Sequence, residues 1–286
     1  MTSSRIPRHV GRRLQGRPTS DGAGVKLNRV FAHGQGSELD PFLMLDEFSS
    51  YDATDYLAGF PSHPHRGFET VTYMLDGHML HEDHLGNRGD LKSGDVQWMT
   101  AGRGIVHSEM PQQREGRMRG FQLWINLPAA EKMKPASYRD IPAAEIPVAT
   151  LPGGVVVKVI AGDLEADGVA VAGPIQGLST EPLYMDVSLP PRATFTQPLP
   201  SAHAAFVYVF EGRVDIGGAG LEKGQGAVLV DGDVCTITGA ADGGRVLILA
   251  GKPLGEPVVQ YGPFVMNTAA EIQQALQDYQ TGRLTA

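Results

Sequence analysis

Short apolar or alternating runs, separated by glycine and proline, fill the chain from Phe42 to Ala250. Runs of this length, bounded by turn residues and without helical periodicity between them, predict an all-β fold of the barrel or sandwich type. The expected strands are Phe42–Phe48, Phe68–Leu75, Val96–Thr100, Ile105–Met110, Gly120–Asn126, Val155–Ile160, Leu183–Leu189, Phe206–Phe210, Val214–Ile216, Ala227–Val230 and Arg245–Ala250.

Two segments depart from this strand pattern. Leu127–Pro147 is rich in proline and charge, and it predicts a linker with one short helix at Ala129–Met133. In the tail, Thr268 and Glu271 stand three residues apart, which is the order of a helix capping box. Apolar residues follow at helical spacing until Gly282, so we expect one terminal helix that packs by its apolar face.

The two halves of the chain resemble each other. Tyr73–Gly77 has the form of Val209–Gly212, a strand that ends in an acidic residue and a turn glycine. Leu91–Val96 likewise has the form of Leu221–Gly226, a turn that enters the next strand. The repeat predicts two copies of one antiparallel barrel.

The length of 286 residues, of which 42 % are hydrophobic, fits two folded domains. We expect an N-terminal barrel at residues 1–133. A C-terminal barrel, joined by the terminal helix, is expected at residues 134–286.

Charge and cysteine content limit the expected binding partners and the expected cellular compartment. A formal net charge of −8 disfavours direct binding to nucleic acid, which needs a basic surface. The apolar runs are too short for a membrane span or a signal peptide, and the arginine-rich start fits a solvated arm or an edge strand better than a transit peptide. Cys235 stands alone in an apolar run, which predicts a packed, inert thiol in a reducing, cytoplasmic compartment.

The candidate chemistry lies in two pairs of residues at alternate positions, His63-Pro-His65 and His107-Ser-Glu109. On a strand, side chains two residues apart point to the same face. If the two strands meet inside one barrel, three imidazoles and one carboxylate converge. Such a set suits one divalent transition metal and leaves coordination positions open for O₂ or a substrate.

Other polar residues compete with this set. His78, His81 and His84 follow a turn at a spacing of three, which fits neither face of a strand and predicts a solvated hairpin arm. Glu69 shares parity with His65, but four strand residues separate the two by about 13 Å. Glu69 therefore competes with Glu109 as a metal ligand only if the strand bends.

The second half of the repeat provides an internal control. When its turn glycines are aligned with those of the first half, the positions of the four candidate ligands fall on residues that do not bind metals: Pro198, Pro200, Ile237 and Gly239. The C-terminal half is therefore expected to be a metal-free scaffold.

At these residues the chain resembles the pirins, a bicupin family. The motifs that carry the resemblance are Asp40–Phe48, His63–Val71, Gly94–Gly102, His107–Pro111, Leu123–Leu127, Glu256–Val259 and Gly262–Thr268. The resemblance implies two cupin-type antiparallel β-barrels with one metal, usually iron, in the N-terminal barrel. It also implies His63, His65, His107 and Glu109 as the ligands.

Some bacterial pirins resemble quercetinases, which cleave the flavonol heterocycle with O₂ and release carbon monoxide. That resemblance implies a dioxygenase whose Fe²⁺ binds the flavonol, with Glu109, or a free carboxylate beside the metal, as the group that takes the 3-hydroxyl proton. Other pirins are iron-dependent regulators, so the alternative is a redox-dependent binding protein for a transcription factor or a metabolic enzyme. Its docking rim would then be formed by Arg66, Lys92 and Arg103, for which ordinary solvated charges are the equal alternative. A cupin scaffold with an adventitious metal is the third interpretation.

Overall fold

The computed structural model describes residues 5–34 and 36–286, which fall into two compact units. Unit 1 lies within Met1–Gly16, Gln35–Pro41 and Ala144–Pro253, and unit 2 comprises Arg17–Gly34, Phe42–Ala143 and Leu254–Ala286. Each unit thus combines separate stretches of the chain. The linear division expected after residue 133 differs from these units in where it places the first strand, residues 134–143 and everything from Leu254 onward, including the C-terminal helix.

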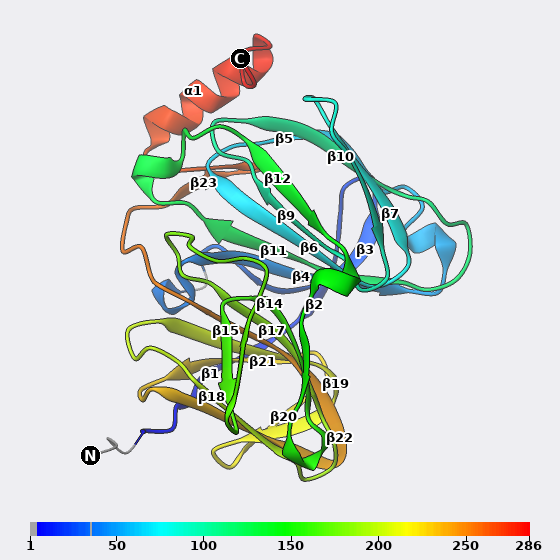
Figure 1. The fold of residues 1–286 in the computed structure, drawn as a ribbon. Helices are drawn as coiled ribbons and strands as arrows, with labels where there is room; N and C mark the ends of the chain where they lie inside the picture. The colour runs from blue at the N-terminus through cyan, green and yellow to red at the C-terminus, as the bar shows by residue number, and fades with distance from the viewer. Residues whose placement is uncertain (1–4, 35) are drawn as a thin grey trace. The chain divides into compact units, whose positions relative to one another are not determined.

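Unit 2 contains two antiparallel sheets, with strand orders β12-β9-β6-β11-β4-β3-β2 and β5-β10-β7-β8 (Figure 1). A separate hairpin is formed by β23 and β24. The strands are β2 (Arg17–Asp21), β3 (Val25–Ala32), β4 (Phe42–Ser50), β5 (Phe60–His65), β6 (Phe68–Asp76), β7 (His78–Asp83), β8 (Arg88–Lys92), β9 (Val96–Thr100), β10 (Ile105–Pro111), β11 (Met118–Asn126), β12 (Ser137–Ile141), β23 (Val259–Tyr261) and β24 (Phe264–Met266).

Unit 1 is built on one large sheet of order β1-β21-β19-β22-β17-β14-β13, to which β18 and β20 also pair, and on the hairpin β15-β16. The strands are β1 (His9–Gln15), β13 (Val148–Thr150), β14 (Val156–Ala161), β15 (Asp163–Ala166), β16 (Val169–Ala172), β17 (Leu183–Leu189), β18 (Thr194–Pro198), β19 (Ala204–Ile216), β20 (Ala219–Glu222), β21 (Gln225–Val230) and β22 (Val234–Gly251).

The repeat predicted from the sequence is present in the strand pairing. In unit 2, β6 lies between β9 and β11; in unit 1, β19 lies between β21 and β22. The register agrees as well, because Tyr73 pairs with Val96 and Tyr208 pairs with Gly226. The two units therefore share one cupin topology. Among the described residues the sheets do not close into complete barrels, so each unit is better described as a cupin-like sandwich.

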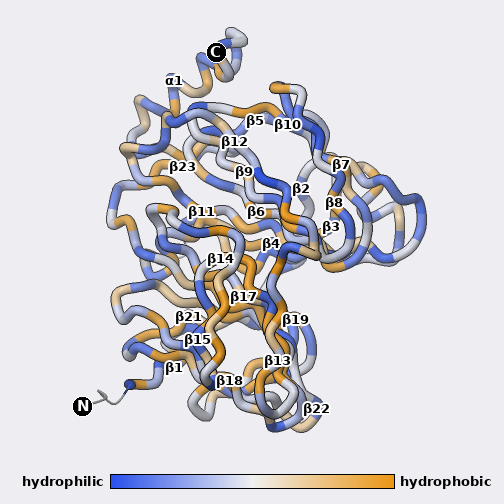
Figure 2. The backbone as a smooth tube through the Cα atoms, in the orientation of Figure 1, coloured by the Kyte–Doolittle hydropathy of each residue, from blue (hydrophilic) through white to orange (hydrophobic). Residues whose placement is uncertain are grey.

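The core of unit 1 is almost entirely aliphatic and aromatic. Figure 2 shows long hydrophobic stretches along its strands, β17 among them. The alternate residues of β17 belong to this core: Leu183, Met185, Val187 and Leu189. Cys235 is completely buried in it, and burial raises the pKa of the thiol to about 12. The expectation of a packed, inert thiol is confirmed.

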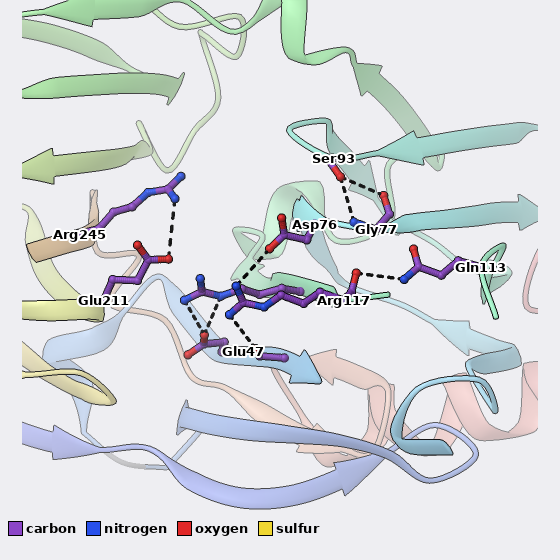
Figure 3. Close-up of polar contacts among 10 residues, drawn as sticks. Glu47, Asp76, Gly77, Ser93, Gln113, Arg117, Glu211 and Arg245 are labelled. Atoms are coloured by element: carbon purple, nitrogen blue, oxygen red, sulfur yellow. Dashed lines mark hydrogen bonds and ion pairs between the residues drawn. The ribbon is translucent and has the colours of Figure 1, made fainter. Parts of the chain in front are cut away.

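Unit 2 contains more buried charge. Arg119 on β11 donates to Glu47 on β4 at 3.3 Å, and both side chains are buried. Figure 3 shows Glu47 in this contact, together with the more exposed pair of Arg117 and Asp76. A buried ion pair of this kind requires both partners, because removing one leaves an uncompensated charge.

The segment expected to be a linker is more ordered than the prediction. Its short helix is the 3₁₀ turn Ala129–Glu131, and residues Ser137–Ile141 form β12, which pairs with β9. Proline and charge led to the linker interpretation. The strand nevertheless forms because Ile141 is buried while the polar residues between it and Ser137 lie at the edge of the sheet.

The terminal helix α1 (Ala269–Gln280) is confirmed, with the capping box between Thr268 and Glu271. Its buried residues pack on β24 and on Val106 of β10. At the other end of the chain, β1 pairs along β21 as an edge strand of unit 1, as the edge-strand interpretation expects. No helix among the described residues is long and apolar enough to span a membrane.

Candidate metal centre

The two histidine motifs lie on neighbouring strands. β5 and β10 are antiparallel, and His107 is directly opposite His63 in the register. Val106, between Ile105 and His107, packs toward the terminal helix. Because side chains alternate along a strand, His107 points to the opposite face, toward β5 and the interior of unit 2.

Three imidazoles meet at this point. One ring nitrogen from each of His63, His65 and His107 lies within 4.8 Å of the other two. His63 Nε2 and His65 Nε2 are 3.0 Å apart, and the His63 and His107 ring centroids are 4.3 Å apart. The convergence that the alternate spacing predicted for the three histidines is therefore present.

Burial favours the neutral form of two of these rings. Burial lowers the pKa of His65 and His107 well below the usual value, and the neighbouring histidines lower it further. His63 Nδ1 lies 2.8 Å from the Pro61 carbonyl oxygen, which can only accept, so His63 Nδ1 carries the hydrogen. The lone pair of His63 then lies on Nε2, which faces the cluster and is 3.0 Å from His65 Nε2.

A buried polar atom tests whether a metal fits here. His107 Nε2 is buried and has no hydrogen-bond partner. Buried polar groups normally have partners, since an unsatisfied one costs about 1–3 kcal/mol. Three imidazoles whose ring nitrogens lie a few ångströms apart are a donor set for a borderline divalent ion. The residues fit the metal that the sequence pattern suggests.

Glu109 lies beside this group but is not within it. Its side chain is buried on β10 and lines the same cavity as His63 and His65. Thr72 Oγ1 donates to Glu109 Oε1 at 2.9 Å, and Gln122 Nε2 approaches both carboxylate oxygens at 3.3 Å. Metal ligation by Glu109 stays a prediction.

Glu69, the competing carboxylate, is bound elsewhere. It accepts from Thr100 Oγ1 at 2.6 Å and from Trp98 Nε1 at 3.3 Å, and burial raises its pKa. It is not part of the histidine group among the described residues. These contacts give Glu69 a structural role in joining β6 to β9.

The cavity next to the histidines has a volume of about 600 Å³ and lies within unit 2. Its polar lining includes Thr72, Glu109 and Gln122 at the histidine end and the Arg29–Asp46 pair on β3 and β4. Most of the remaining wall is apolar and partly aromatic, formed by residues such as Leu43, Met44, Phe48, Phe60, Met79 and Trp124. This volume suits a flat, ring-containing small molecule.

Sequence reasoning missed His81. Instead of lying in a solvated hairpin arm, it is only 2 % exposed on β7, and its Nε2 is 2.8 Å from His107 Nδ1. The spacing of three between the histidines obscured this, because only the middle one points inward. His78 and His84 are more exposed, and His78 bonds to Asp90.

Arg66, between His65 and Gly67, is also buried rather than part of a docking rim. It donates to the main-chain oxygen of Arg103, to the Asp278 carboxylate at 2.8 Å and to the Leu284 main-chain oxygen at 3.2 Å. The expectation that Arg66 lies on a docking rim is wrong. It connects both histidine motifs to the C-terminal segment of unit 2.

Close main-chain packing also joins the histidine motifs to the C-terminal segment of unit 2. Gly67 and Gly104 have positive φ angles, and a Cβ at either would collide with the main-chain oxygen of Val265 or Leu284. Lys132 Nζ donates to the oxygens of Gly67, Asn126 and Val265. The strands of the histidine motifs are therefore supported from behind by the last residues of the chain.

Comparison with known proteins agrees with the fold and the motifs. The Pirin family model matches residues 24–125, and the model of the Pirin C-terminal cupin domain matches residues 184–285. A Pseudomonas aeruginosa protein named as a putative quercetin 2,3-dioxygenase is 53 % identical over 272 residues, covering 94 % of this chain and 95 % of that protein.

Solved structures are similar too. A quercetin 2,3-dioxygenase from Acinetobacter baumannii has a TM-score of 0.90 at 35 % identity, covering 98 % of this chain and 99 % of that one. A bacterial pirin from Escherichia coli in complex with nickel(II) has a TM-score of 0.63 at 20 % identity, covering 85 % and 99 %, and so shares the fold. With two family models matched in order and relatives this similar over nearly their whole length, the chain belongs to the pirin family.

Proposed function

We propose that this pirin is a metal-dependent dioxygenase of the quercetin 2,3-dioxygenase type, which cleaves the heterocycle of a flavonol with O₂ and releases carbon monoxide. One observation carries the proposal. Three imidazoles meet beside a largely apolar cavity of about 600 Å³, which is lined by two of them, His63 and His65, and by Glu109. The dioxygenase names of similar proteins support the same substrate class.

His63, His65 and His107 would hold one divalent ion, with iron as the metal expected for a pirin and Glu109 as a candidate fourth ligand. When bound, the ion supplies a Lewis acid for the flavonol oxygens and a site for O₂. Glu69 takes no part, because its hydrogen bonds to Trp98 and Thr100 occupy it elsewhere.

The protein's own groups position the substrate and move its proton. Glu109 accepts the proton of the flavonol 3-hydroxyl, and Thr72 and Gln122 keep its carboxylate in place by donating to it. Trp124, whose ring lies 5.3 Å from that of His65, and Phe60 offer faces for a planar ring system. The apolar wall keeps water from the reacting carbon atoms.

The test is oxidation of quercetin by protein loaded with Fe²⁺ under air. We expect loss of the flavonol absorption band and release of carbon monoxide, both abolished by His63→Ala and His107→Ala. His9→Ala, which removes an exposed histidine of unit 1, is the matched control and should leave turnover unchanged. Absence of turnover above the two cluster variants would overturn the enzyme assignment.

The alternative, an iron-dependent binding protein, stays a prediction. Of its three expected docking residues, Arg66 is buried, while Arg103 and Lys92 are exposed. Capture of a partner that depends on the oxidation state of the bound iron, together with no flavonol turnover, would favour this alternative.

A further inference from the structure

His81 is a buried residue that the proposed chemistry does not use. It lies on β7, on the side of β10 opposite to β5, and pairs in register with Glu109. Its ring contacts the His107 ring at 4.8 Å between centroids and the Tyr138 ring at 5.7 Å. These contacts fix the plane of His81 and aim its Nε2 at His107.

The hydrogen bond between the two rings has a direction if His107 binds a metal. A neutral imidazole carries one hydrogen, on either Nδ1 or Nε2. His107 Nε2 has no hydrogen-bond partner, while His107 Nδ1 is 2.8 Å from His81 Nε2. A ligating Nε2 must be unprotonated, so the hydrogen must lie on His107 Nδ1 and His81 Nε2 must accept it.

We propose that His81 is a positioning residue of the metal centre, which accepts a hydrogen bond from His107 Nδ1 and so fixes the ring orientation and tautomer that present His107 Nε2 to the ion. The inference rests on the proposed metal centre. In this role His81 does not bind the ion but holds one of its ligands, His107, in place. The Pro61 carbonyl does the same for His63, where the direction of the bond is set by chemistry alone.

The repeat provides a comparison for this position. Glu109 pairs with His81 in unit 2, and at the corresponding place in unit 1 Gly239 pairs with Val214. Val214 is fully buried in the apolar core. The fold therefore accepts an apolar side chain at this position, which favours a role for His81 beyond filling space.

The test measures Co²⁺ affinity by absorption titration of the metal-free protein. His81→Leu removes the acceptor and should weaken Co²⁺ binding by about 10–100-fold, the usual effect of losing such a support. His81→Gln places an amide oxygen near the position of Nε2 and should retain most of the affinity. His78→Leu, on the same strand, is the matched control and should bind as the unaltered protein does.

Unaltered affinity in His81→Leu would overturn the inference, and so would an equal loss in His81→Gln, since that pattern indicates packing alone. A second measurement uses the unaltered protein without metal, so it does not depend on whether a variant folds. Histidine ¹⁵N NMR of the unaltered, metal-free protein should find His107 protonated at Nδ1, and protonation at Nε2 would contradict the proposal. Protein that binds Co²⁺ but fails to consume flavonol refutes the proposed activity and leaves the role of His81 intact.

Discussion

Unit 1 and unit 2 share a strand order and a register, yet only unit 2 brings three histidines together among the described residues. Opposite His63, β10 carries His107; at the same place in unit 1, Phe195 on β18 faces Ile237 on β22. Phe195 and Ile237 are fully buried core residues. The cupin topology thus provides a convergent interior position, and side-chain identity alone decides whether it becomes a core or a site.

The register also corrects one detail of the sequence comparison. Turn glycines placed the counterparts of His63 and His65 at Pro198 and Pro200, whereas strand pairing places them at Phe195 and Gln197. The shift arises because the connection from β18 to β19 is longer than the connection from β5 to β6. Gln197 bonds to the main chain of Asp163 and Glu165. The conclusion that the second copy lacks the ligand set is unchanged.

The largest expected effect comes from giving unit 2 the side chain of unit 1. His107→Ile removes one donor and should abolish stoichiometric binding of Co²⁺ or Fe²⁺, because two histidines alone hold such ions weakly. The fold should persist, since Ile237 occupies the same place in unit 1. Metal content after dialysis measures the effect, and retention of one ion per chain would contradict it.

The reverse exchange gives unit 1 the histidine of unit 2. Ile237→His buries an imidazole with no partner in an apolar core, and it should lower the free energy of unfolding by about 2–4 kcal/mol. Urea denaturation with and without Co²⁺ is the measurement. Metal-dependent stabilisation of this variant beyond that of the unaltered protein would show that one histidine is enough to start a site in unit 1.

A smaller loss of stability is expected from removing the ion pair between Arg66 and Asp278, a contact of unit 2. Asp278→Asn leaves the buried guanidinium without its carboxylate and should cost about 1–2 kcal/mol, because Asp278 itself is partly open to solvent. Metal affinity should also fall, since Arg66 adjoins His65. Asp242→Asn, an exposed carboxylate of unit 1, is the control. Equal stability of the two variants would refute the contribution of this contact.

The smallest effect concerns Cys235. Because the folded state raises the pKa of its thiol from the usual 9.0 to about 12, the associated stability is complete below pH 9 and declines as the pH rises toward 12. At pH 8 an aromatic disulfide reagent should react only as fast as unit 1 opens. Immediate reaction in the folded protein would contradict the burial. Comparing this rate with the rate of metal loss tests whether the two units open together.

Local sequence patterns correctly predicted the features that depend on neighbouring residues, namely the direction of side chains on a strand and the start of a helix. Alternate spacing placed His63 and His65 on one face, and the order of Thr268 and Glu271 marked the start of the helix. His81 and Arg66 were misassigned because their partners, His107 and Asp278, are distant in the chain. No period or motif encodes such contacts, since they depend on how strands pair.

The discontinuous composition of unit 2 affects the order of events during synthesis. Residues Arg17–Gly34 and Phe42–Ala143 leave the ribosome early, but Leu254–Ala286 emerge only after all of Ala144–Pro253. Lys132 donates to the Val265 carbonyl and Arg66 donates to the Asp278 carboxylate, and both acceptors lie in Leu254–Ala286. A nascent chain therefore cannot complete these supports behind its histidines until Leu254–Ala286 have left the ribosome. We expect full-strength binding of an ion only after that point, and the intervening unit has time to fold first.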